Sequence, residues 1–114
     1  MKYELFIKLY KEALEYDSEE IYIAERGWQE WMDQVEEVER ISFILKRVFY
    51  YASHSFRVVR EGRKLSRAKF SRTYEIPLRT VEAWEYGETK MSNYDKLFVC
   101  YTFLMDDILD FKSV

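Results

Sequence analysis

Apolar side chains recur at helical spacing along the longest stretches of this sequence. Over residues 3–16 they fall at i, i+1, i+4, i+5, i+8 and i+9, and oppositely charged side chains stand four residues apart. From Val35 to Ala52 the apolar positions keep the same period for almost five turns. The stretch from Ser92 to Phe111 is apolar on nearly every side. This pattern predicts three long helices and an all-α fold.

The pattern is less regular between the first two of these helices. Asp17 and Ser18 predict a stop and a new N-cap, while residues 21–23 fit either the start of a helix or a short strand. Trp28 and Trp31 are spaced to share one helical face, so we interpret both as core residues.

Shorter helices are predicted in residues 65–90, which read LSRAKFSRTYEIPLRTVEAWEYGETK. Ser66 can cap a first short helix, Pro77 can begin a second one, and Gly87 can end it. Two short helices joined by a tight turn form a helix-turn-helix, which presents its second helix to the major groove of DNA. Further along, Ser92 and Asp95 match a capping box for the last helix.

This stretch resembles the phage-repressor-like (XRE-type) helix-turn-helix family, whose members carry Leu-Ser at the start and Trp-Glu-x-Gly at the end. The matching residues are Leu65, Ser66, Phe70, Ser71, Ile76, Val81, Trp84, Glu85 and Gly87. The segment IPLRTVEAWEYG is similar to a form common in small regulators of Gram-positive bacteria and their mobile elements. The resemblance covers about residues 54–105 and implies a repressor-like core that binds double-stranded DNA. Because the family usually has Gly at the places of Lys64 and Glu75, it also implies a left-handed backbone at both.

Three side chains of the second short helix are candidates for reading bases. Val81 and Trp84 would anchor this helix on the core, which leaves Leu78, Arg79 and Glu82 facing a groove. Arg79 can fork onto guanine O6 and N7, and Glu82 can accept from cytosine N4.

The net charge of −3 is unevenly distributed. Residues 1–56 carry −5, residues 57–79 carry +6, and residues 80–114 carry −4. The basic block fits an anionic partner, and it fits equally well a solvated face that offsets the acidic remainder. Arg67 stands where the family usually has a DNA-contacting Gln, and we expect it to contact phosphate. The other expected phosphate contacts are Arg63, Lys64, Lys69, Arg72, Thr80 and Lys90.

Some functional classes are not expected. One cysteine, Cys100, and one histidine, His54, provide neither a disulfide framework nor a Cys/His zinc site within the chain. No acid–base constellation indicates an enzyme, and no metal or cofactor is expected. No apolar run approaches the ~18 residues that span a bilayer, so we expect a cytoplasmic protein without a membrane contact.

The last helix suggests a second copy of the chain as a partner. A helix in a chain of 114 residues rarely finds neighbours on every side, so either the N-terminal helices cover it or part of it pairs with another protomer. A homodimer is also what a helix-turn-helix protein on a palindromic site requires. The candidate interface residues are Leu104, Ile108 and Phe111.

We therefore expect residues 1–53 to form an N-terminal helical extension packed on a repressor-like domain, residues 54–114. The leading functional hypothesis is a sequence-specific DNA-binding protein, a small transcriptional regulator of a phage or mobile element. The alternative hypothesis is an anti-CRISPR-type inhibitor or an antitoxin that uses the same scaffold. It would bind a protein through the acidic, aromatic N-terminal half, because acidic flanks repel DNA.

Overall fold

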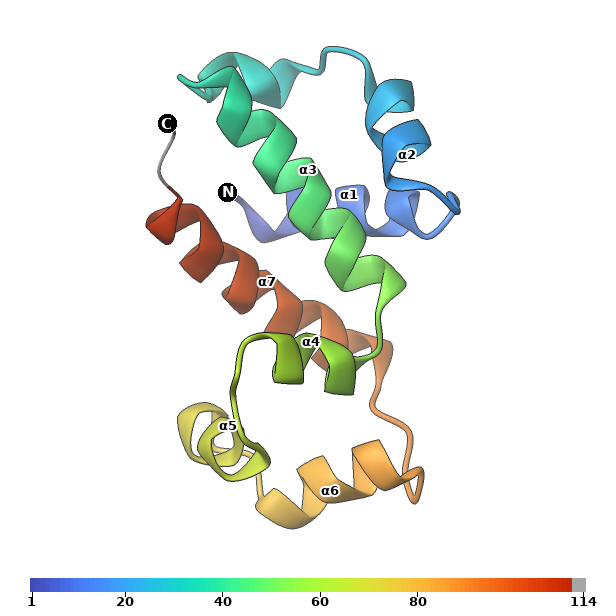
Figure 1. Ribbon diagram of the computed structural model, residues 1–114, viewed down its shortest axis with the longest axis vertical. Coiled ribbons are helices and arrows are strands. Elements are labelled where there is room, and N and C mark those ends of the chain that lie inside the picture. The colour runs from blue at the N-terminus through green and yellow to red at the C-terminus, as the bar shows by residue number, and fades with distance from the viewer. Residues whose placement is uncertain (112–114) are drawn as a thin grey trace. The chain divides into compact units, whose positions relative to one another are not determined.

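The computed structural model describes residues 1–111, and within them the chain is all-helical, with seven α-helices, one 3-10 helix and no strand (Figure 1). The predicted all-α class is therefore confirmed. The elements are α1 (Tyr3–Ala13), α2 (Glu19–Arg26), η1 (Glu30–Gln34), α3 (Val38–Ser53), α4 (Phe56–Gly62), α5 (Arg67–Tyr74), α6 (Leu78–Tyr86) and α7 (Asn93–Asp110).

The chain divides into two compact units. Unit 1 contains Met1–Ser53 and the chain from Leu97 onward, and unit 2 contains His54–Lys96. The first boundary, between residues 53 and 54, coincides with the predicted one. The second boundary is not predicted, because the sequence groups residues 54–114 in one domain, whereas most of α7 belongs with the N-terminal helices.

Side-chain contacts explain why α7 groups with residues 1–53. The rings of Tyr3 and Tyr101 lie 5.0 Å apart in an edge-on arrangement, and the Tyr101 hydroxyl donates to the Met1 carbonyl. Arg47 of α3 donates to the Asp107 carboxylate at 3.1 Å. Buried apolar side chains also stabilise unit 1, and α1, α3 and α7 each contribute some of them.

The segment between α1 and α3 decides one open alternative and corrects one prediction. Residues 21–23 lie inside α2, whose N-cap Ser18 accepts from the Ile21 N–H at 3.3 Å, so the strand alternative is wrong. The predicted inward packing of Trp28 is wrong as well, because 64% of its side chain is exposed and its Nε1 donates to Asp33. Gly27 explains this result: with φ of 60° it ends α2, so Trp28 and Trp31 do not share one helix.

Unit 2 is built around a small aromatic core. The ring of Phe56 from α4 lies edge-on to Phe70 of α5 at 5.0 Å and to Trp84 of α6 at 5.8 Å. Val59 and Val81 of the same unit are fully buried. Serine hydroxyls cap the helices as the sequence predicts, since Ser66 accepts from the Lys69 N–H at 3.1 Å and Ser92 from the Asp95 N–H at 3.0 Å.

The turns on either side of α5 use left-handed backbone without glycine. Lys64 has φ of 57° and Glu75 has φ of 55°, which confirms the expectation for both positions. Each non-glycine residue costs about 1 kcal/mol in this conformation. The turn after α5 recovers part of that cost, because the Ser71 hydroxyl donates to the Ile76 carbonyl and the Ile76 N–H donates to the Ser71 carbonyl.

Candidate functional site

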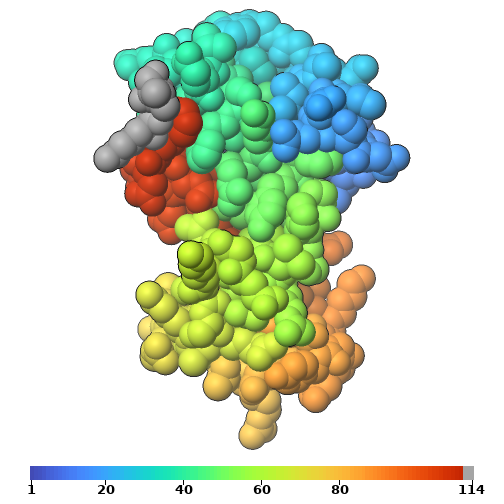
Figure 2. All heavy atoms as spheres, viewed as in Figure 1, coloured from blue at the N-terminus to red at the C-terminus, as the bar shows by residue number. Residues whose placement is uncertain are grey.

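The α6 helix presents one face to the interior of unit 2 and another to solvent. Val81 is fully buried and Trp84 is half-buried, whereas Leu78 and Arg79 are exposed and Glu82 is half-buried. This is the division that the sequence predicts for the second short helix. In Figure 2 the yellow and orange atoms of α5 and α6 reach the surface of unit 2.

Tyr86 is an exposed residue of α6 that is absent from the predicted base contacts. It is 58% exposed and stands one turn beyond Glu82, on the side of the helix that carries Leu78 and Arg79. Extending the i, i+4 series from Leu78 through Glu82 would have found it. A tyrosine at this place adds a ring and a hydroxyl to the exposed face of α6.

A buried carboxylate connects α6 to α4. The side chain of Glu85 is only 1% exposed, and Arg60 is 5% exposed. Arg60 donates from Nε to Glu85 Oε2 at 2.7 Å and from Nη2 to Oε1 at 2.8 Å, while its Nη1 donates to the Leu65 carbonyl at 2.7 Å. Burial alone would raise the pKa of Glu85, but the hydrogen bonds and charges of Arg60 and Arg67 hold this pKa below its usual value. The bidentate pair fixes the rotation of α6 relative to α4.

Arg67 is positioned by the same carboxylate. Its Nε donates to Glu85 Oε1 at 2.9 Å, and its guanidinium lies 5.0 Å from the centre of the Tyr86 ring. The hydrogen bond to Glu85 raises the pKa of Arg67. Within residues 1–111 its two terminal amino groups have no hydrogen-bond partner. An anion at the start of α5 could therefore bind these amino groups while Nε stays on Glu85.

Exposed cations surround these helices. Within the described chain five basic side chains of unit 2 are exposed and make no ion pair or side-chain hydrogen bond; they are Lys64, Lys69, Arg72, Arg79 and Lys90. Arg63 and Thr80 are half-buried. By sequence, residues 54–96 carry ten basic and six acidic side chains, a net charge of +4.

The candidate dimer residues on α7 occupy three different environments. Leu104 is fully buried, Ile108 lines a pocket of unit 1, and Phe111 stacks on Phe43 with ring centres 4.5 Å apart. A second chain could reach Leu104 only if unit 1 opened, so this residue contributes to the core of the single chain. Leu109 is the large apolar side chain that α7 leaves most exposed in unit 1, at 82%.

The His, Cys, Asp and Glu side chains of the described residues form no cluster typical of a metal site. Within residues 1–111, no three His, Cys, Asp or Glu side chains lie close enough together to hold a metal ion. Cys100 is buried and His54 is exposed. Across the same residues, every helix is too short or too polar to cross a bilayer.

Comparisons with known protein families, with curated proteins and with solved structures find no match for this chain.

Proposed function

We propose that the chain is a sequence-specific DNA-binding protein in which α6 enters the major groove and α5 lies over the phosphate backbone. The observation that carries this proposal is the exposed face of α6, with Leu78, Arg79 and Glu82, beside cations of unit 2 that no carboxylate of the described chain neutralises. The helices α5 and α6 are short and are joined by the three residues 75–77. A pair of helices of this size can place its second helix in the major groove of DNA.

Each cation has a part in this proposal. Arg79 is the side chain of α6 that can donate two hydrogen bonds to a guanine. Arg67 keeps its Nε on Glu85 and directs its terminal amino groups to a phosphate. Lys64, Lys69 and Arg72 add contacts that do not depend on sequence. By its resemblance to repressor-like proteins, the chain would act as a small transcriptional regulator of a phage or mobile element.

A second candidate function is favoured by the charge of unit 1. Residues 1–53 and 97–114 carry eight basic and fifteen acidic side chains, a net charge of −7, which repels DNA. An anti-CRISPR-type inhibitor or an antitoxin would use such a surface to bind a protein.

Replacing Arg79 by alanine tests the proposed base contact. Binding to the best duplex from a selection on random sequences should weaken by about 1–3 kcal/mol, because one bidentate contact is lost. Repeating the selection with the variant should relax the preference at one base position.

Arg72→Ala provides the matched control, since Arg72 is also exposed but stands on α5. It should weaken all duplexes alike and leave the selected sequence unchanged. If Arg79→Ala and Arg72→Ala have the same effect on sequence preference, α6 does not read bases.

A further inference from the structure

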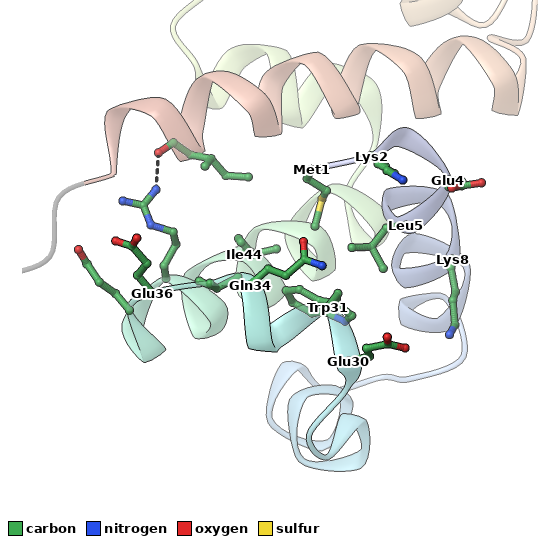
Figure 3. Close-up of a pocket in the computed structure, with 14 residues that line it drawn as sticks. Met1, Lys2, Glu4, Leu5, Lys8, Glu30, Trp31, Gln34, Glu36 and Ile44 are labelled. Atoms are coloured by element: carbon green, nitrogen blue, oxygen red, sulfur yellow. Dashed lines mark hydrogen bonds between the residues drawn. The ribbon is translucent and has the colours of Figure 1, made fainter.

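Unit 1 contains a groove that the proposed DNA contact does not use. It has a volume of about 1170 Å³ and lies among α1, η1, the start of α3 and Ile108 of α7 (Figure 3). Met1, Leu5, Trp31 and Ile44 supply its apolar surface, and in Figure 3 their side chains converge from three separate elements. A concave site of this volume with apolar side chains on its wall is suited to one or two inserted side chains.

Acidic residues slightly outnumber basic residues in the lining of this groove. Four acidic residues line it, namely Glu4, Glu30, Glu36 and Glu37, against the three cations Lys2, Lys8 and Arg40. Arg40 is already engaged, because its Nη1 donates to the Ile108 carbonyl at 3.1 Å and its guanidinium lies 5.2 Å from the Phe111 ring centre.

Glu37 supplies an independent indication of a ligand. Its Oε2 atom is shielded from solvent and has no hydrogen-bond partner in the described chain. A buried carboxylate oxygen without a donor is costly, and a donor from outside would remove that cost. The same residue lines the groove, so a small rotation of its side chain would present this unsatisfied acceptor to an incoming ammonium or guanidinium group.

We propose that this groove binds a short cationic, amphipathic segment of a partner protein. An apolar side chain of that segment packs on Trp31 and Leu5, while a Lys or Arg side chain reaches Glu37 and the surrounding carboxylates. The net charge of −7 on unit 1 favours a cationic protein over nucleic acid, since phosphates would be repelled across the whole unit. All lining residues of the groove belong to unit 1, so partner binding here can be tested whether or not unit 2 binds DNA.

The test is a selection of short random peptides displayed on phage against the immobilised full-length protein, with counter-selection on the Trp31→Ala variant. Peptides that survive should combine Lys or Arg with a large apolar residue. A synthetic peptide of the enriched sequence should lose at least ~10-fold in affinity on Trp31→Ala, as expected for an aromatic anchor. Glu37→Gln should weaken the same peptide by about tenfold, because a charge-assisted hydrogen bond is lost.

Trp28→Ala is the matched control, because Trp28 is an exposed tryptophan of the same segment that does not line the groove. It should change affinity by less than about twofold. Circular dichroism and sedimentation of each variant separate loss of the site from loss of the fold and from self-association. Enriched peptides that are neutral or acidic, equal binding to the wild type and Trp31→Ala, or occupation of the groove by a second copy would each overturn the proposal.

Discussion

Replacing Glu85 by leucine should destabilise unit 2 by about 3–5 kcal/mol, because the change leaves the Arg60 guanidinium buried without a counter-charge. Arg60 would keep one hydrogen bond to the Leu65 carbonyl, which does not neutralise it. Urea unfolding followed through Trp84 fluorescence, in a background with phenylalanine at positions 28 and 31, reports on unit 2. Glu82→Leu on the same helix is the matched control and should change stability by less than about 0.5 kcal/mol.

A second variant separates the effect of the unpaired charge of Arg60 from the effect of altered packing. Arg60→Met combined with Glu85→Leu should recover most of the lost stability, since a buried ion pair and an apolar pair of similar volume are often equivalent. If Glu85→Leu alone is as stable as the wild type, the bidentate contact does not hold α6 to α4.

The same pair predicts a pH dependence. The pKa of Glu85 is lowered in the folded chain, so the pair contributes fully above the usual carboxyl pKa of about 4.3. As the pH falls below that value and through the lowered pKa, protonation of Glu85 should remove the contribution. Unit 2 of the wild type should therefore lose stability on acidification more steeply than that of the Arg60→Met, Glu85→Leu double variant.

Leu104→Glu should unfold unit 1, whereas Leu109→Glu should not. Leu→Ala alone costs ~2–5 kcal/mol at a fully buried site, and a carboxylate in place of Leu104 adds the cost of burying a charge. Leu109 is 82% exposed, so its replacement should change stability by less than about 0.5 kcal/mol. Thermal unfolding by circular dichroism measures both effects.

Sedimentation of the Leu109→Glu variant then tests the proposed homodimer. If α7 joins two protomers through its exposed side, this variant should be a folded monomer at concentrations where the wild type is a dimer. A wild-type chain that is monomeric at micromolar concentrations would contradict a dimer formed through α7.

The sequence predicts the local elements of this fold well because their signals are local. Ser18, Ser66 and Ser92 each have the acceptor that the first turn of a helix needs, and each caps a helix in the structure. The spacing of Val81 and Trp84 likewise identifies the buried side of α6, and thereby its exposed side.

Long-range pairings are not visible in the sequence. Arg60 and Glu85 are twenty-five residues apart, and nothing local shows that they meet. The apolar character of α7 likewise does not indicate that Leu104 is buried in the single chain while Leu109 is exposed. Helical spacing predicts a buried Trp28 only if the helix continues through Gly27, and the backbone leaves the helix at that residue.

The salt dependence of duplex binding by the full-length protein tests the DNA-binding proposal most directly. Each neutralised phosphate contributes a slope of about −0.9 to log affinity against log salt. Four cations are assigned to phosphates and therefore predict a slope of about −3 to −4 per protomer: Lys64, Arg67, Lys69 and Arg72. A folded protein that binds no duplex at about 50 mM salt, where phosphate contacts are strongest, would contradict the proposal and favour a protein partner.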